Sequence, residues 1–503
     1  MLLASIERLR ALPRFVEIAR TMVRFGMHDL VHSVGVHRVL DEAGHALGWD
    51  PEPELAAKPL PERLRLALEA LGPAFVKLGQ VLASRVDLLG PEWIASLDRL
   101  HDRASPVAFD ALEAQLLADL GTPVARAFAT FDIAPSAAGS VAQVHRASLP
   151  GGAQVAVKIR RPGVEASIEA DVLLLEALAT WWEEEQPESR RYQPVEVVRQ
   201  LRKSLTREVD FSAEARAQER FAESFRDSET IVVPRVHAQF TRPSLLVMDW
   251  IDGIPATDLE AVDVAGLDRE LLAARGADAV LKMVLVDGFF HADPHPGNVF
   301  FLADSRVALI DFGMVGWLSD KRRDELVDLM AALAARDPDA MRDVLIGWAD
   351  GERVHAERFS EDIGRMLHLY EHAALREIHL GTLLSEIAAV MREHHLTMPA
   401  DLALLFKALI TLEGLGTRLV PHFRLIEHVT PYVERLVRER WEPRRAAERL
   451  SGLTRETGRA LRAFPRLLEA LARRLGNEDL AIRLEMRELG TFGRHLESSV
   501  NRL

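Results

Sequence analysis

The chain begins with apolar and polar residues in the pattern of an amphipathic helix. Phe15, Ile18 and Met22 fall on one side of such a helix, and charged residues occupy many of the positions between them. The same spacing recurs until about Leu120. The helices that it predicts cover 1–50, 60–100 and 111–120.

The pattern changes after residue 120, where short runs rich in valine and alanine alternate with turns at 135–140 and 149–152. Short apolar runs between turns predict strands, which favour β-branched side chains. The predicted strands cover 128–131, 141–147, 154–160, 232–241 and 244–250, and the helices predicted after the third strand cover 164–184 and 195–225.

From Thr257 onward the chain is predicted to be almost entirely helical, apart from a hairpin at 299–302 and 307–310. Five strands with helices inserted after the third, followed by a helical half, form the layout of a bilobal kinase. The pattern therefore predicts an α+β, protein-kinase-like fold with an N-terminal helical extension and a mostly helical C-lobe and tail. The predicted divisions are the extension (1–110), the N-lobe (111–250), the C-lobe (251–430) and an Arg-rich amphipathic tail (431–503).

The composition is that of a globular protein, with 48% hydrophobic and 27% charged residues among 503. The sequence contains no cysteine, which excludes disulfides, thiol catalysis and thiolate metal sites. The net charge of −14 argues against nucleic acid as a partner, because binding to its phosphates requires a basic surface.

The charge is distributed unevenly, and both ends of the chain are basic. Residues 1–40 hold six arginines and three acidic residues, and residues 431–503 hold 16 arginines and 11 acidic residues. Basic ends on an acidic body predict contact with an anionic membrane surface, although solvated helix faces would have the same composition. No apolar run reaches the roughly 18 residues of a membrane span, so we expect a soluble or peripheral protein.

Three motifs match the chemistry of phosphoryl transfer, which needs a cation for the phosphates, oxygen ligands for Mg²⁺ and a group beside the nucleophile. Lys158 ends the run Val155-Ala156-Val157-Lys158 on a predicted strand, as in the kinase V-A-I-K pattern. Asp293 and Asn298 have the Asp-x4-Asn spacing of the kinase catalytic loop, and Asp311 begins Asp-Phe-Gly farther along. These residues predict a nucleotide site.

The histidines beside Asp293 also permit a different kind of site. His291, Asp293 and His295 together would offer ligands to zinc or iron, but the prolines between them restrict the loop and no fourth ligand stands nearby. Mg²⁺ prefers oxygen ligands, which Asn298 and Asp311 supply. We therefore expect Mg²⁺ at Asn298 and Asp311.

The loop between the first two predicted strands is rich in alanine where a protein kinase has glycines. It consists of Ala137-Ala138-Gly139-Ser140 and leads into Val141. Alanine carries a Cβ atom, so its backbone approaches phosphates less freely than that of glycine. We expect this loop to be stiffer and to bind nucleotide differently.

Together these motifs resemble the UbiB family of atypical kinase-like ATPases, which is linked to ubiquinone biosynthesis. The alanine-rich loop and the Val-Ala-Gln-Val-His after it look like the family's loop, although Gly139 replaces a third alanine and would loosen it. Lys77-Leu78-Gly79-Gln80 is similar to the family's K-x-G-Q motif, and Glu208-Val209-Asp210 to its E-x-D motif. The resemblance covers 60–421 and includes the run 408–414.

The resemblance implies a role for each matching residue. Lys158 would pair with Glu214 and contact the nucleotide phosphates, and Asp293 would occupy the catalytic-base position. A helix carrying Lys77 and Gln80 would lie in the cleft against Glu208 and Asp210 and block a protein substrate. Mg²⁺ would bind to Asn298 and Asp311, and the nucleotide to Ala137, Ala138, Gly139, Ser140, Val141, Lys158, Glu214, Met248, Asp249 and Ile251.

The resemblance implies a Mg²⁺-dependent ATPase or atypical kinase that uses ATP or ADP and supports ubiquinone or isoprenoid-lipid metabolism at the cytoplasmic face of a membrane. Its expected partners are nucleotide, an anionic or quinone-type lipid and a biosynthetic enzyme complex. Two alternatives remain open: a small-molecule phosphotransferase like the aminoglycoside and choline kinases, and a nucleotide-binding scaffold. Bacterial members commonly end in a transmembrane hairpin, so we expect that this sequence stops short of one.

Overall fold

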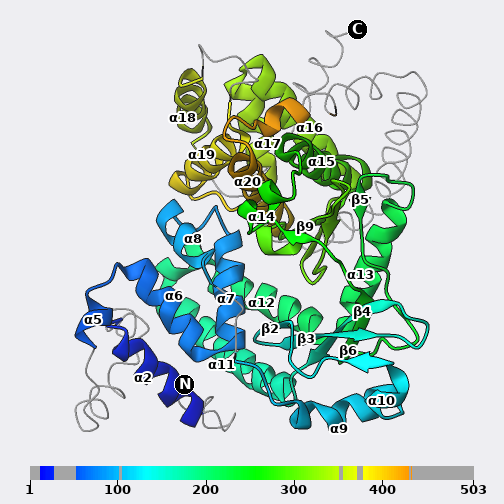
Figure 1. The fold of residues 1–503 in the computed structure, drawn as a ribbon. Coiled ribbons are helices and arrows are strands. Elements are labelled where there is room, and N and C mark those ends of the chain that lie inside the picture. Colours follow the sequence, from blue (N-terminus) through cyan, green and yellow to red (C-terminus); the bar gives the residue numbers. More distant parts are fainter. Residues whose placement is uncertain are drawn as a thin grey trace, which may run out of the picture. The chain divides into compact units, whose positions relative to one another are not determined.

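The computed structural model describes residues 12–27, 52–100, 105–349, 355–370, 378–429 and 432 (Figure 1). These residues belong to one compact unit that spans Met1–Glu434. Of the helix predicted for residues 1–50, the described part is α2 (Leu12–Arg24). The predicted Arg-rich tail, apart from Tyr432, lies outside the described residues.

The segment predicted as a single helix from 60 to 100 forms separate helices. Gly72, with a φ of +98°, ends the first of them, and residues 85–90 separate the next two. A proline stands in the first turn of each, where its missing N–H leaves no donor unpaired. The N-terminal helices after α2 are α5 (Pro53–Ala56), α6 (Leu60–Leu71), α7 (Pro73–Ser84) and α8 (Pro91–Leu97).

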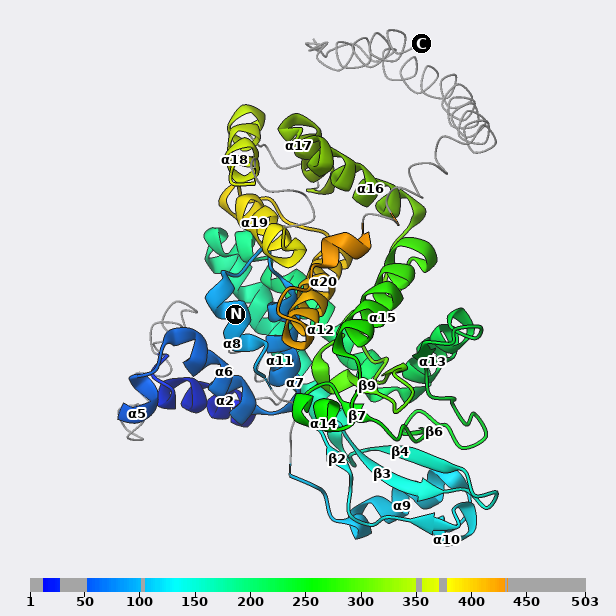
Figure 2. The ribbon, with the colours of Figure 1, turned by 45° about the horizontal axis from the view of Figure 1, so that its top comes forward.

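An antiparallel sheet forms the N-lobe, and short helices cover one of its faces (Figure 2). Its elements are α9 (Phe109–Leu120), α10 (Val124–Ala127), β1 (Thr130–Phe131), β2 (Ala137–Ala138), β3 (Ala142–Ser148), β4 (Gln154–Arg160) and β6 (Leu245–Asp249). The strand order is β1-β3-β4-β6, with β2 also paired to β3. Leu112 and Leu116 of α9 pack on Val155 and Val157 of β4, so this face of the sheet is core.

The strand predicted at 232–241 is wrong for most of its length. Only β5 (Ile231–Val232) forms there, and it pairs with a strand of the C-lobe rather than with the N-lobe sheet. Pro234 follows, and because proline has no N–H it cannot donate to a ladder. Beyond β5, Val236 makes a single bridge to Met248. The N-lobe sheet is completed instead by β2, a segment that was predicted as part of a turn.

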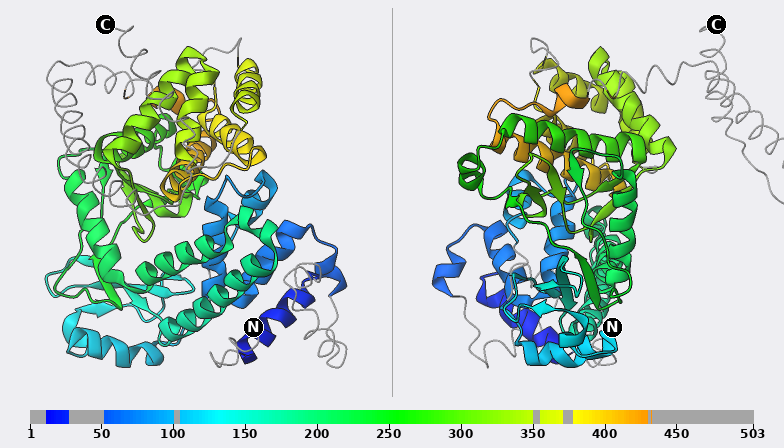
Figure 3. Two further views of the ribbon diagram at one scale, coloured as in Figure 1. Left: turned by 180° about the vertical axis from the view of Figure 1, so that it is seen from behind. Right: turned by 45° about the vertical axis from the view of Figure 1, so that its right-hand side comes forward.

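Helices enter between β4 and β5, as predicted. They are α11 (Val164–Glu185), the 3₁₀-helix η1 (Pro187–Tyr192), α12 (Pro194–Val209) and α13 (Phe211–Ser224). The predicted helix 195–225 is divided at Asp210, whose carboxylate accepts a hydrogen bond from the Ser212 amide and thereby caps α13. Seen from behind, α11 and α12 lie side by side and next to the N-terminal helices, with which they share a core that includes Phe75, Leu174 and Leu201 (Figure 3).

The C-lobe is mostly helical and holds two small sheets. Its strands are β7 (Ile254–Pro255), β8 (Phe289–His291), β9 (Val299–Phe301), β10 (Val307–Leu309) and β11 (Val315–Trp317), ordered β5-β10-β9-β7 and β11-β8. Its helices are α14 (Leu259–Val264), α15 (Arg269–Leu281), the π-helix η2 (Lys282–Asp287), the 3₁₀-helix η3 (Pro296–Asn298), α16 (Asp320–Ala335), α17 (Pro338–Trp348), α18 (Ala356–His368), α19 (Leu380–Glu393) and α20 (Ala400–Leu419). The predicted hairpin is confirmed as β9 and β10, whereas β8 and β11 were not predicted.

Within the described ranges, no helix combines the length and apolar character that crossing a membrane requires. The antiparallel sheet of the N-lobe and the mostly helical C-lobe confirm the predicted α+β class.

Candidate nucleotide and metal site

An ion pair joins the N-lobe sheet to the helix beside it. Lys158 lies in β4, and its Nζ donates to both carboxylate oxygens of Glu214, each at 2.8 Å. Glu214 lies in the first turn of α13, which Asp210 caps, and the Phe211 ring lies 5.3 Å from the Lys158 nitrogen. The ammonium is therefore held in place by a buried carboxylate and an aromatic ring.

The charges around this pair decide its protonation. Burial alone would lower the pKa of Lys158, but the carboxylates of Asp311 and Glu214 raise it above its usual value. Burial raises the pKa of Glu214, and the Lys158 ammonium opposes that shift. Two short contacts to one ammonium support the ionised pair, so Lys158 carries a positive charge at neutral pH.

Asp311 approaches the same lysine from the C-lobe. Its Oδ2 lies 3.9 Å from Lys158 Nζ, and its Oδ1 accepts a hydrogen bond from the Gly313 amide at 3.1 Å. Its φ of +59° is left-handed, a conformation that costs most residues about 1–2 kcal/mol and that aspartate tolerates better than most. Lys158 lowers the pKa of Asp311 to about 2, so a half-exposed, ionised carboxylate lies beside the lysine.

Phe312, the next residue, links the two halves of the site. It is buried, and its ring centroid lies 4.9 Å from that of Phe221 on α13 and 5.5 Å from that of His291. Because the Phe312 ring packs against both Phe221 and His291, it holds the segment that carries Asp311 against the helix that carries Glu214.

The catalytic-loop residues lie around a buried, neutral histidine. His291 Nδ1 accepts from the Asp293 amide at 3.2 Å, so its proton belongs on Nε2, which faces the Ile310 carbonyl at the same distance. Burial lowers the pKa of His291. Asn298 Nδ2 donates to the Asp293 carbonyl at 3.2 Å, an orientation that leaves Oδ1 of Asn298 to accept a cation. His291 thus fixes the loop.

The geometry does not favour the alternative metal centre on His291, Asp293 and His295. Both ring nitrogens of His291 face backbone groups, and His295 Nδ1 accepts from the Gly297 amide at 2.9 Å. Across the described part of the chain, no group of three His, Asp or Glu side chains is arranged to hold a metal ion. Oxygen atoms of Asn298 and Asp311 fit Mg²⁺, which commonly binds few protein ligands and completes its shell with phosphates and water.

Helix α7 brings Lys77 to the same cleft. Lys77 Nζ lies 2.6 Å from Glu208 Oε2 on α12, and the lysine is buried. Burial would lower the pKa of Lys77, but Glu208, with Asp293 and Asp311 adding to it, raises the value. A helix of the N-terminal extension therefore places a second ammonium within the field of the carboxylates of Asp293 and Asp311.

Gly79 has a packing role in the K-x-G-Q motif. A Cβ at this position would lie 2.2 Å from Leu100 Cδ1 and 2.9 Å from Leu68 Cδ1, and both leucines are buried. A side chain at Gly79 would therefore force these buried leucine side chains to shift.

We predict that Gly79→Ala destabilises the protein by about 1–2 kcal/mol, because the added methyl group overpacks a filled core. The free energy of unfolding in urea measures this. Gly364→Ala on α18, where a Cβ would meet nothing within 4 Å, is the matched control. It is expected to stabilise the protein, since alanine favours helix over glycine. Equal effects of the two changes would contradict the packing explanation.

The other residues expected in the cleft differ in their contacts. Gln80 is half-buried on α7. Asp210 caps α13, so its contact in the structure positions the helix of Glu214. Ala137 and Ala138 form β2, and Gly139 donates its amide to the Ala142 carbonyl at 2.8 Å. The expectation of a turn at the alanines is therefore wrong.

Val141, expected to bind nucleotide, is 3% exposed and packs in the core of the helical extension. Ser140, just before it, is half-buried. The Gly139 backbone has no left-handed φ, unlike seven other glycines of the described chain, so alanine would fit its conformation. The departure at Gly139 thus alters side-chain bulk and not backbone shape.

The strand that leads to the inter-lobe hinge is engaged within the protein. Met248 is buried, and the Asp249 carboxylate faces His237 at 2.8 Å. The amides of Asp249 and Trp250 donate to the carbonyls of Arg235 and Gln154, so these two amides are engaged within the protein. Ile251 is half-buried, and its contact with the nucleotide stays a prediction.

Contacts between the extension and the C-lobe were not predicted. Lys407 on α20 lies 3.3 Å from Asp98 at the end of α8, and the pKa of Asp98 is raised by burial and by Asp293 against the opposing effect of Lys407. Asp87, buried in a pair with Arg85, accepts from the Met398 amide at 3.0 Å. Two features of the sequence mark these contacts. One is Lys407, a lysine within an apolar helix, and the other is the charged pair Arg85–Asp87, which follows the apolar helix α7.

Known proteins match this chain over most of its length. Residues 99–345 match the model of the ABC1 atypical kinase-like domain, and residues 363–424 match that of the UbiB helical domain. A probable protein kinase UbiB of Xanthomonas campestris is 34% identical over 510 residues, covering 98% of this chain and 91% of that protein. A probable protein kinase UbiB of Marinobacter nauticus is 36% identical over 399 residues, 78% of this chain and 72% of that protein.

One solved structure, a Mycobacterium tuberculosis protein in complex with erythromycin, aligns with 79% of this chain and 99% of its own at 21% identity and a TM-score of 0.47. The kinase-like domain match confirms the predicted kinase-like fold.

Proposed function

Since this chain belongs to the UbiB family of atypical kinase-like proteins, we propose that it is a Mg²⁺-dependent ATPase or atypical kinase that supports ubiquinone or isoprenoid-lipid metabolism at a membrane. The observation that carries the proposal is the position of Lys158, bound by both oxygens of Glu214 and 3.9 Å from Asp311. A fixed cation next to an ionised carboxylate is the arrangement that holds nucleotide phosphates through a metal ion.

The residues beside this pair suit the remaining tasks of the reaction. Asn298 and Asp311 would hold Mg²⁺, which supplies charge stabilisation on the phosphate oxygens when bound. Asp293, hydrogen-bonded through its backbone to His291 and Asn298, would accept the proton of the attacking group. Lys158 would orient the phosphates, and burial around it strengthens that interaction.

The proposal favours ATP hydrolysis or transfer to a small acceptor over phosphorylation of a protein. Helix α7 packs against both α12 and α20, and its Lys77 lies within the field of Asp293. A protein segment would compete with α7 for that space, whereas water or a small molecule needs little room.

The proposed membrane and lipid partners follow from the charge at the two ends of the chain and from the family resemblance. The basic composition of residues 1–40 and 431–503 supports attraction to an anionic lipid surface, which acts over about a Debye length. Quinone-type lipids and a biosynthetic enzyme complex are proposed partners from the family resemblance.

Hydrolysis of ATP by the purified chain tests the proposal, with and without Mg²⁺ and with vesicles of phosphatidylglycerol or of phosphatidylcholine. Mg²⁺-dependent release of phosphate that anionic vesicles increase is the expected result. Binding of nucleotide without hydrolysis under every condition would replace the enzyme with a nucleotide-binding scaffold. A labelled small-molecule product in place of phosphate would identify a phosphotransferase.

A further inference from the structure

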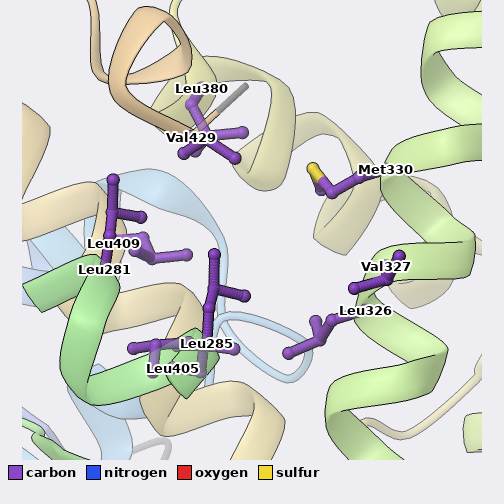
Figure 4. Close-up of a pocket in the computed structure, with 10 residues that line it drawn as sticks. Leu281, Leu285, Leu326, Val327, Met330, Leu380, Leu405, Leu409 and Val429 are labelled. Atoms are coloured by element: carbon purple, nitrogen blue, oxygen red, sulfur yellow. The ribbon is translucent and has the colours of Figure 1, made fainter. Parts of the chain in front are cut away.

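A cavity in the C-lobe is lined only by leucine, valine and methionine side chains (Figure 4). Figure 4 shows Leu281, Leu285, Leu405 and Leu409 on one side and residues of α16, including Met330, on the other. Its volume is about 40 Å³. None of its lining residues takes part in the nucleotide site described above.

The chemistry of the lining selects the occupant. The space exceeds the roughly 10–15 Å³ that one water molecule needs by the same measure, but water also needs polar partners, and this lining offers none. A drug-sized ring compound requires a pocket of about 300 Å³ or more, so the space suits a narrow aliphatic chain. The end of a lipid tail has the shape and polarity that match it.

Polar groups next to the lining suit the head of such a molecule. His428 precedes the lining residue Val429, and its Nδ1 lies 3.2 Å from Asp278 Oδ1 on α15. Asp278 stands about one helical turn before Leu281, and its side chain is 56% exposed. A hydroxyl group would find both a donor and an acceptor in this pair.

The cavity also borders an element that leads to the catalytic loop. Val284 and Leu285 belong to the π-helix η2, an uncommon conformation that often marks functional sites. After η2 come Gly288, which has a φ of +62°, and then β8, which ends at His291.

The same π-helix is tied to the helix of Glu214. Lys282 Nζ donates to Ser224 Oγ, in the last turn of α13, at 2.6 Å and to Asp287 Oδ2 at 2.8 Å. An occupant of the cavity would therefore touch the element that connects α13 to the catalytic loop.

We propose that this cavity binds the end of an aliphatic chain, of the isoprenoid or fatty-acyl type, with its polar head at His428 and Asp278, and that binding orders η2 and the catalytic loop. The biological meaning of such a site rests on the proposed function, whereas the binding itself does not.

The absence of cysteine from the sequence provides a direct test. Met330→Cys places a unique thiol at the cavity, and Val264→Cys places one at a residue that is 85% exposed, as the matched control. The rate of alkylation is measured in the full chain with farnesol or 1-dodecanol added. Saturating a site slows reaction of a covered thiol in proportion to occupancy, about tenfold at ten times Kd.

Slower alkylation of Met330→Cys but not of Val264→Cys supports the site, and preference for farnesol or for 1-dodecanol assigns the isoprenoid or the acyl source. Val327→Phe, which fills the cavity, is expected to abolish binding of both alcohols by the otherwise wild-type chain in equilibrium dialysis, and Met330→Phe serves if Val327→Phe does not fold. Unchanged alkylation of Met330→Cys at saturating alcohol overturns the proposal.

The second readout is amide hydrogen exchange of residues 281–291, which should slow when the alcohol binds. Unaltered exchange with proven binding would overturn the link to the catalytic loop. ATP hydrolysis is also measured without alcohol, so that failure of the proposed enzyme can be distinguished from failure of the lipid site. If alcohol slows alkylation of Met330→Cys but the chain hydrolyses no ATP, the proposed enzyme is refuted and the lipid site is retained.

Discussion

Asp311→Asn is expected to lower the turnover of Mg²⁺-ATP by about 10²–10³-fold, the range for removing one electrostatic contact from an active site. The change removes the negative charge and keeps the shape. Asparagine also tolerates the left-handed conformation at φ +59°, so the fold should persist. Since the pKa of Asp311 is about 2, the native carboxylate is ionised throughout the usual assay range. The rate of phosphate release at saturating nucleotide measures the effect.

Asp304→Asn is the matched control for this prediction. Asp304 lies in the turn between β9 and β10, shortly before Asp311 in the chain, but its carboxylate faces Arg306 and the solvent. The Asp304→Asn variant should turn over Mg²⁺-ATP at the same rate as the native chain. Mg²⁺-dependent turnover that survives in Asp311→Asn would show that this carboxylate does not hold the metal and would remove the main support for the proposed site.

Local sequence patterns were sufficient for the elements whose partners are near in the chain. The predicted strand 154–160 has the same bounds as β4. Its apolar residues are buried between α9 and α13, so the local pattern was sufficient to predict it. The hairpin of β9 and β10 was also predictable, since a short polar turn joins two apolar runs. The Lys158, Asp293, Asn298 and Asp311 motifs were recognisable for the same reason: each is a short run with fixed spacing.

Elements that depend on distant partners were not predictable. β5 pairs with β10, whose Val307 stands 76 positions after Ile231, and nothing in residues 231–232 indicates that partner. β8 and β11 have three residues each, which is too short for a periodic signal. The break at Asp210 was missed because an aspartate within a polar helix face looks like any solvated residue until its side chain is seen to cap α13.

In the candidate site, too, some groups were predicted from the sequence and other contacts were not. The pairing of Lys77 with Glu208 followed from a resemblance, because no spacing rule connects residues so far apart in sequence. Contacts of Asp98 with Lys407 and of Asp87 with Met398 join the extension to the C-lobe, and neither was foreseen. Short motifs predicted candidate groups for phosphate and metal, and the family resemblance predicted the helix beside them. The contacts of the extension with the C-lobe became visible only in the fold.

Glu208→Gln is expected to destabilise the chain by about 3 kcal/mol, the low end of the range for breaking a buried ion pair. Lys77 is 7% exposed, and without Glu208 its ammonium loses the carboxylate that lies 2.6 Å away. Burial disfavours an unpaired ammonium, so the remaining carboxylates, Asp293 and Asp311, compensate only partly. The loss is measured as the decrease in the free energy of unfolding in urea. The dependence of that free energy on urea concentration should not change.

The control is Glu62→Gln, which breaks a partly exposed Lys–Glu pair with Lys58 at 2.8 Å and should cost much less, because solvent screens such a pair. Adding Lys77→Met to Glu208→Gln removes the unpaired charge and should restore most of the lost stability, so the double-mutant cycle gives a coupling energy well above zero. If Glu208→Gln costs no more than Glu62→Gln, the ammonium of Lys77 is solvated. Helix α7 would then not be held in the cleft by this pair, and the physical reason for preferring a small acceptor or water over a protein substrate would be lost.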